Sequence, residues 1–150
     1  MALSEFVYKR RVEYRETDAS GMAHFTVFFA YAEEAEHAMW RAAGLSVEPH
    51  ESEIGWPRVS ASCEYHRALK FEQEFEIAVE IREISRRTIT YGGTITRDGE
   101  RVATATWKIA CVAKLPDGTM RSTDIPGEIA DRLKPSGDAP RTSPLAPPTL

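Results

Sequence analysis

The stretch RETDASGMAHFTVFFAYAEEAEHAMW, from Arg15 to Trp40, decides how this chain folds. It begins with a turn of small residues around Asp18 and continues into a segment with the period of an amphipathic helix. From about Phe28 to Ala43, apolar residues recur at intervals of three and four, and charged residues occupy most positions between them. Alanine is abundant, so another surface can approach this helix closely, and Gly44 is a natural stop.

The segments on either side of this helix alternate with the two-residue period of β-strands. A first strand is predicted over residues 6–14, where only Arg10 interrupts the apolar face. Four further strands are predicted at 59–65, 75–81, 89–95 and 103–111. Short connections, such as RDGE at 97–100, force neighbouring strands to run antiparallel. The sequence therefore predicts an α+β fold in which an antiparallel sheet wraps around one long central helix.

The overall composition is that of a soluble globular domain, with 42% hydrophobic and 28% charged residues. The net charge of −4 argues against a protein that binds nucleic acid through electrostatics. No apolar run is long enough to span a membrane, and the N-terminus lacks an apolar signal region, so a cytoplasmic protein is predicted. Cys63 and Cys111 are predicted to be buried thiols, and the cysteines and histidines show no metal-ligand spacing.

A proline-rich tail marks the clearest boundary in the chain. The final stretch, KPSGDAPRTSPLAPPTL, holds five of the nine prolines and few large apolar residues. Proline fixes φ and removes a backbone donor, so neither helix nor sheet is expected to persist there. One domain is therefore predicted over residues 1–134, followed by a flexible or extended tail over residues 135–150.

The turn and helix described above resemble a known motif. The segment YRETDASGMAHFTVFFAYAEEA, from Tyr14 to Ala35, is similar to the opening motif of the hotdog-fold acyl-CoA thioesterases. More narrowly, it resembles the branch that includes 4-hydroxybenzoyl-CoA thioesterase and the YbgC-type enzymes. The resemblance extends from residue 6 to about residue 133 and implies the hotdog fold, whose element order is the one that the periodicity predicts. One departure is Val27, which stands where the family often has an asparagine.

The resemblance implies thioester hydrolysis by a carboxylate at the start of the helix. Asp18 matches the catalytic position and would act as general base toward water, or as the nucleophile that forms an anhydride. The backbone N–H of Phe25 would polarise the thioester carbonyl, since a helix start carries unpaired N–H groups. Glu33 is an alternative base, and His24 would orient a water or contact the acyl group. A turn or capping role for Asp18 is the competing interpretation.

Recognition of coenzyme A requires cations that pair with its phosphates. Arg86 and Arg87, in the turn between two predicted strands, are the first candidates, and Arg67 and Lys70 are the second. The expected walls of the acyl pocket are Phe25, Phe28, Tyr31 and Trp56. No metal or cofactor is expected beyond the coenzyme A that forms part of the substrate.

The resemblance also implies self-association, because hotdog domains commonly join their sheets edge to edge. A homodimer or tetramer is expected, with Asp18 of one chain and pocket residues of another forming each site. Two other functions stay open: a non-catalytic module that binds acyl-CoA, and a hydratase or dehydratase that acts on acyl thioesters. The second is disfavoured because Ala23 and Thr26 flank His24 and Phe25, whereas the dehydratases have a Gly-His-Phe-Pro setting.

Overall fold

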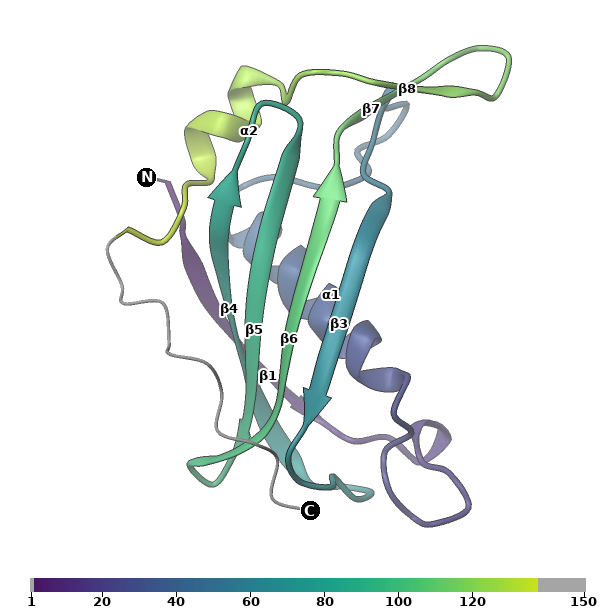
Figure 1. The fold of residues 1–150 in the computed structure, drawn as a ribbon, viewed down its shortest axis with the longest axis vertical. Helices are drawn as coiled ribbons and strands as arrows, with labels where there is room; N and C mark the ends of the chain where they lie inside the picture. The colour runs from purple at the N-terminus through teal and green to yellow at the C-terminus, as the bar shows by residue number, and fades with distance from the viewer. Residues whose placement is uncertain (1, 138–150) are drawn as a thin grey trace.

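The computed structural model describes residues 2–137 and shows one large sheet packed against one long helix (Figure 1). The large sheet contains β1 (Glu5–Arg11), β3 (Arg58–Tyr65), β4 (Glu74–Ile84), β5 (Thr88–Arg97) and β6 (Glu100–Ala110), and the long helix is α1 (Val27–Ala42). The remaining elements are the 3-10 helix η1 (Tyr14–Glu16), the short strands β2 (Ile54–Gly55), β7 (Val112–Lys114) and β8 (Met120–Ser122), and the helix α2 (Gly127–Arg132). Residues 138–150, most of the predicted tail, lie outside the described residues, so the domain boundary at 134 stays a prediction.

Every neighbouring pair of strands in the large sheet is antiparallel, in the order β1-β4-β5-β6-β3. Helix α1 crosses one face of this sheet, with its N-terminal end near the end of β3 (Figure 1). β1 and β3 are the two edges of the sheet, and β2, β7 and β8 form a separate small sheet. The predicted α+β hotdog fold, with an antiparallel sheet around one long helix, is confirmed.

The largest buried side chains of the core are aromatic and come from α1 and the sheet. Trp40 and Trp107 are both almost fully buried. Nε1 of Trp40 donates to the Tyr91 hydroxyl (2.8 Å), and Nε1 of Trp107 donates to the buried Glu36 carboxylate (2.7 Å). These rings therefore bury a large apolar area without leaving an indole donor unsatisfied.

Glycines shape β5 and the turn that follows it. A Cβ at Gly93 would lie 3.0 Å from the Trp107 ring, so the absent side chain lets this ring lie close to the strand. The two residues of the β5–β6 turn, Asp98 and Gly99, both have positive φ values, of 51° and 77°. A two-residue hairpin loop with positive φ at both positions matches the twist of its strands, which is why the RDGE sequence predicts this turn.

The apolar positions of β3 are less buried than their alternation suggests. Val59 is 56% exposed and Cys63 is half-buried, although Cys111 is buried as predicted. β3 pairs only with β6, so its outer edge has no neighbour in the described chain. The period predicts the strand, but it does not reveal whether the surface that covers the strand belongs to the same chain.

Candidate active site

The loop before α1 holds Asp18 in a tight hydrogen-bonded turn. The base of the loop closes where Thr17 pairs with Ala23, and the Asp18 N–H donates to the Met22 carbonyl oxygen (2.9 Å). Inside the turn, the Gly21 N–H donates to the Asp18 carbonyl oxygen (2.9 Å). Gly21 has a φ of 82°, a left-handed value that glycine adopts at little cost. These contacts hold the exposed Asp18 side chain at a fixed place ahead of the helix.

The carboxylate of Asp18 is ionised at neutral pH. The hydroxyl of Ser20 and the Ser20 N–H (2.8 Å) both donate to its Oδ1 oxygen. These hydrogen bonds favour the charged form and hold the pKa of Asp18 below its ordinary value. The other oxygen, Oδ2, accepts none of the side-chain hydrogen bonds found within residues 2–137, so it is free to accept a proton or to attack a carbon.

The turn that enters α1 is held on both sides of Phe25. Upstream, the His24 N–H donates to the Glu16 carbonyl oxygen (2.8 Å), and downstream the Tyr65 hydroxyl donates to the Phe25 carbonyl oxygen (2.6 Å). The His24 ring also meets Thr26, with Nδ1 2.7 Å from Oγ1. The Phe25 N–H itself donates none of the backbone hydrogen bonds found in the described chain. It is therefore an available donor of the kind that stabilises an oxyanion.

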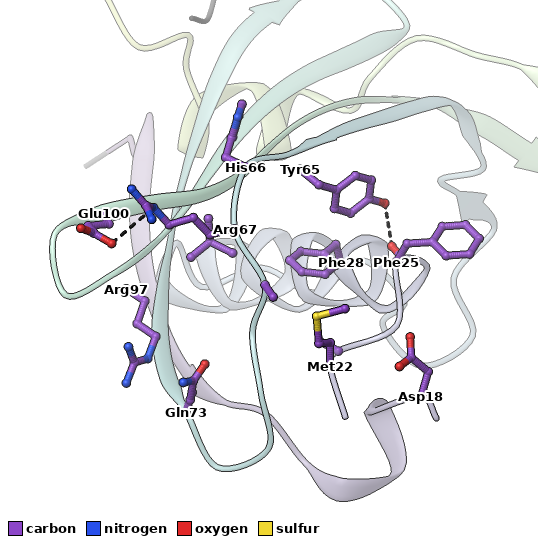
Figure 2. Close-up of a pocket in the computed structure, with 13 residues that line it drawn as sticks. Asp18, Met22, Phe25, Phe28, Tyr65, His66, Arg67, Gln73, Arg97 and Glu100 are labelled. Carbon is purple, nitrogen blue, oxygen red and sulfur yellow. Dashed lines mark hydrogen bonds and ion pairs between the residues drawn. The ribbon is translucent and has the colours of Figure 1, made fainter. Parts of the chain in front are cut away.

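Asp18 lines a cavity of about 710 Å³ at this end of the molecule. Figure 2 shows Asp18 on one side of the cavity, with Met22 and Phe28 toward its middle. On the opposite side, Nε of Arg67 lies 3.3 Å from Oε2 of Glu100 (Figure 2). The other lining residues are Ala23, Phe25, Tyr65, His66, Ala68, Gln73, Arg97 and Val102. A mostly apolar cavity with a few polar groups at its ends is typical of small-molecule sites.

A second hollow, of about 650 Å³, also contains Asp18. Its lining includes the polar side chains of His24, Thr26 and Glu34. Asp18 therefore borders both an apolar space and a polar one. A carboxylate in this position can contact an acyl group in the first space and a water molecule in the second.

A buried ion network supports the base of the Asp18 loop. Arg10 on β1 interrupts the apolar stripe as predicted, yet its side chain is only 12% exposed because it pairs with Glu16. Nη1 of Arg10 donates to Glu16 Oε1 (2.6 Å), and Nε donates to Oε1 of Glu34 on α1 (2.8 Å). The Tyr31 hydroxyl also donates to Glu16 Oε1 (3.0 Å), and the Arg10 guanidinium lies 4.7 Å from the centre of the Tyr31 ring. The network joins β1, η1 and α1, and its central residue, Glu16, lies two residues before Asp18.

The hydrogen bonds within this network keep its charges in place. Burial disfavours the charged form of Glu16, but hydrogen bonds from Arg10, the Glu13 N–H and Tyr31 outweigh burial and hold the pKa of Glu16 below its ordinary value. Burial likewise opposes the charge of Arg10, and its bonds to the two carboxylates raise its pKa above the ordinary value. At neutral pH the network therefore pairs an ionised Arg10 with an ionised Glu16.

The structure brings four of the predicted site residues together in the first cavity: Asp18, Phe25, Phe28 and Arg67. His24 lies beside them in the second hollow. Lys70 is adjacent through its backbone, which pairs with Met22 in an isolated β-bridge. These residues come from the loop before α1, from the first turn of α1 and from the connection between β3 and β4, three segments that the fold places at the same end of the sheet.

Three other predicted residues lie outside the lining of this cavity. Glu33 is exposed on α1 and pairs with Arg58 (3.2 Å). Tyr31 is fully buried within the ion network. Trp56 packs edge-on against Trp40, with 5.1 Å between ring centres. Their proposed roles as base or pocket wall stay predictions.

Arg86 and Arg87 also lie apart from the cavity. They occupy the turn between β4 and β5, at the end of the sheet opposite the start of α1 (Figure 1). Each contacts Oδ1 of Asp124, with its Nε at 3.0 and 2.8 Å respectively. Two guanidinium groups that share one carboxylate keep a net positive charge at this turn, so a role in phosphate binding stays a prediction.

Sequence reasoning missed several residues that line the cavity, among them Met22, Tyr65, Gln73 and Arg97. Tyr65 is the clearest case, because its hydroxyl contacts a residue that lies forty positions earlier in the chain. The available signal was a tyrosine at the end of a predicted strand. That signal does not name a partner, since the contact depends on where α1 crosses the sheet.

Two features of the described chain bear on other functions. Within residues 2–137, no group of three or more His, Cys, Asp or Glu side chains is arranged to hold a metal ion. In the same part of the chain, none of the helices is both long and apolar enough to cross a membrane.

Comparisons with known proteins identify the family. The thioesterase superfamily matches residues 20–104. A protein of Aquifex aeolicus with the name "Putative esterase" is 33% identical over 130 residues, covering 86% of this chain and 98% of the relative. The acyl-CoA thioesterase YbgC of Haemophilus influenzae is 24% identical over 126 residues, covering 83% of this chain and 90% of that protein. The crystal structure of a hypothetical protein from Aquifex aeolicus has a TM-score of 0.80 and 31% identity, covering 86% of this chain and 99% of that one.

The chain therefore belongs to the thioesterase superfamily and is a thioester hydrolase. A crystal structure of 4-hydroxybenzoyl-CoA thioesterase shares the fold, with a TM-score of 0.77 at 16% identity, covering 86% of this chain and 98% of that one. The predicted resemblance to hotdog-fold thioesterases of the 4-hydroxybenzoyl-CoA and YbgC type is thus confirmed.

Proposed function

We propose that this thioesterase hydrolyses acyl-CoA thioesters, with Asp18 as the carboxylate that acts at the reacting carbon. The observation that carries the proposal is one shared cavity, lined by an ionised carboxylate and by Phe25, whose N–H is unpaired within residues 2–137. Thioester hydrolysis needs both an activated nucleophile and a donor for the developing oxyanion. The likeness to the acyl-CoA thioesterase YbgC supports coenzyme A as the carrier.

Two routes lead from this arrangement to the products. In the first, Asp18 accepts a proton from water while the water oxygen bonds to the thioester carbon. The carbonyl oxygen becomes an oxyanion, which the Phe25 N–H stabilises, and its collapse breaks the C–S bond. The departing thiolate takes up the proton held by Asp18. In the second route, an Asp18 oxygen bonds to the carbon, the C–S bond breaks and the thiolate leaves, so a mixed anhydride forms. Water then hydrolyses the anhydride, which restores the Asp18 carboxylate and releases the free acid, and a proton from that water passes to the thiolate.

Both routes consume one water and yield a free acid and coenzyme A, so neither needs a cofactor. Met22 and Phe28 would supply the apolar wall for the acyl group. His24, in the polar hollow beside Asp18, would orient the water. Arg67 and Lys70, two cations at this end of the sheet, would meet the phosphates of coenzyme A.

Assembly into a homodimer or tetramer would complete the site. The edge strand β3 has an open side, and Val59 on this strand and Phe25 near it are 56% and 61% exposed. These apolar groups are suited to contact with a second copy of the chain. The β4–β5 turn, which carries Arg86 and Arg87, lies at the far end of the sheet from the start of α1 (Figure 1), so these arginines would reach the same acyl-CoA only from another copy.

A thiol-release assay with a panel of acyl-CoA thioesters tests this proposal. Asp18→Asn should lower turnover by about 100-fold or more, because the amide can neither accept the proton nor attack. Asp117→Asn is the matched control, since Asp117 also accepts bonds from a backbone N–H (2.9 Å) and a hydroxyl (2.6 Å) in an exposed turn, that of Thr119. Sedimentation should show the same oligomer for all three proteins.

Two results would change the assignment. Equal hydrolysis by the wild type and Asp18→Asn would refute the role of Asp18 and make Glu33 the next candidate base. Binding of acyl-CoA by the wild type without release of thiol would favour a non-catalytic module.

A further inference from the structure

Tyr65 links the edge of the sheet to the proposed oxyanion donor. It is the last residue of β3, and its hydroxyl donates to the carbonyl oxygen of Phe25 at 2.6 Å (Figure 2). Both residues line the cavity that contains Asp18. This hydrogen bond is the contact by which a strand of the sheet holds the turn that leads into α1.

The Phe25 backbone depends on such a contact. Its side chain is 61% exposed, so burial of the ring does little to fix this residue. The turn is anchored upstream by the bond from the His24 N–H to the Glu16 carbonyl oxygen (2.8 Å). Beyond Phe25, the Thr26 N–H reaches only Nδ1 of His24, at a longer 3.3 Å. The Tyr65 hydroxyl thus makes the shorter of the two hydrogen bonds found, within residues 2–137, to the peptide that joins Phe25 to Thr26.

We propose that Tyr65 is a positioning residue for thioester hydrolysis, because its hydroxyl holds the peptide that joins Phe25 to Thr26 and so limits rotation of the Phe25 backbone, whose own N–H is presented to the substrate oxyanion. This inference rests on the proposed function. Oxyanion stabilisation requires a donor that is oriented before the reaction, since a donor that must reorient loses part of its electrostatic effect. An unrestrained carbonyl at Phe25 would let the peptide on either side rotate.

A role for Tyr65 in proton transfer is disfavoured by the same geometry. Its single O–H is already donated to the Phe25 carbonyl oxygen, so it is not directed at a leaving group. Burial raises the pKa of Tyr65 to about 12, with further contributions from Cys63, so the hydroxyl keeps its proton at neutral pH. The ring has a separate function in packing: it meets Phe28 edge-on, with 5.1 Å between ring centres.

The separation of ring and hydroxyl makes a clean experiment possible. Tyr65→Phe keeps the ring that packs on Phe28 and removes only the hydrogen bond. Tyr14→Phe is the control, because Tyr14 is 76% exposed and lies in η1, before the same loop. The measurements are kcat and KM for one good acyl-CoA substrate, the pH profile of kcat, and hydrogen exchange of the Val27 amide, which donates to the His24 carbonyl oxygen (3.0 Å).

Tyr65→Phe should lower kcat about tenfold, a part of the roughly 10²–10³-fold loss that follows removal of a whole oxyanion-hole donor. KM should change less than about twofold, since the substrate ground state gains little from this donor. The shape of the pH profile should not change, and the Val27 amide should exchange faster than in Tyr14→Phe.

Three results would overturn the inference. If the wild type and Tyr14→Phe are active and Tyr65→Phe matches them, the hydroxyl has no positioning role, whatever its effect on stability. Loss of a basic limb from the pH profile would make Tyr65 an acid catalyst instead. A wild type that releases no thiol from any acyl-CoA would refute the proposed function, and the inference with it.

Discussion

The ion network beneath the Asp18 loop predicts a large loss of stability when Arg10 is neutralised. Arg10→Met keeps most of the aliphatic stem and removes the guanidinium that bonds to Glu16 and Glu34. The Glu16 side chain is only 7% exposed, so water cannot fully replace the lost partner. The same substitution removes the positive charge that separates two carboxylates. The variant is therefore left with an uncompensated buried charge.

Removal of one partner from a buried ion pair costs about 3–5 kcal/mol. That cost is a large fraction of the roughly 5–15 kcal/mol by which domains are stable. For a chain of this length each kcal/mol lowers the unfolding midpoint by about 2–4 °C, so the midpoint should fall by about 6–20 °C. The damage should begin at the loop, because Glu16 also anchors His24 through its backbone carbonyl.

Urea unfolding followed by tryptophan fluorescence, at a fixed protein concentration, measures this loss. Lys9→Met is the matched control, because Lys9 is the preceding residue of β1 and its side chain is 81% exposed, with Nζ 3.9 Å from Oε1 of Glu76. An exposed pair of that kind contributes about 0–1 kcal/mol. A loss below about 1 kcal/mol for Arg10→Met would show that the network is not a stabilising unit, and the reasoning above would be wrong.

Two further predictions concern the same network and the core. The folded state lowers the pKa of Glu16, so the stability that its charge contributes is present above the unfolded pKa of about 4.3 and is lost as pH falls through the lower folded value. In urea titrations from pH 7 to pH 3, the free energy of unfolding of Glu16→Gln should therefore fall less steeply at acid pH than that of the wild type. An equally steep fall in both proteins would contradict this. Gly93→Ala should lower the free energy of unfolding by about 1–3 kcal/mol in thermal unfolding, because the new Cβ would meet the Trp107 ring at 3.0 Å. Gly127→Ala is the control and should not lower it, because a Cβ at Gly127 has open space. Equal effects of the two substitutions would exclude the clash as the cause.

Local patterns were sufficient to predict the fold of this chain. The change from a two-residue period to a helical period and back locates α1 between β1 and the later strands, and short connections leave only an antiparallel order. The RDGE turn is also local, since Asp98 and Gly99 adopt the positive φ values that such a hairpin needs. The same reasoning identified Arg10 as an irregularity in an apolar stripe, but it did not reveal that Glu16 and Glu34 would surround it.

The resemblance marked Asp18 and Phe25 as site residues, and the structure places both in the lining of one cavity, while their roles stay a prediction. Residues whose contribution depends on contacts across the fold were not identified from the sequence. In the sequence, Tyr65 looks like any other strand residue. Its hydroxyl contacts the Phe25 carbonyl oxygen only because α1 packs against the sheet with its N-terminal end near β3. Side chains that support a site carry no sequence signature of their own, because their partners are set by tertiary packing.

The position of the ion network has a physical reason. No residue from Thr17 to Met22 is buried, so the hydrophobic effect cannot fix the segment that carries Asp18. Hydrogen bonds to the residues on either side of this segment fix its position instead. Arg10 bonds to Glu16, which precedes the segment, and Tyr65 bonds to Phe25, which follows it. A buried ion pair is a weak source of stability because its desolvation is costly. Its advantage here is geometric, since two-point pairing fixes an exposed carboxylate loop that apolar contacts would leave free to move.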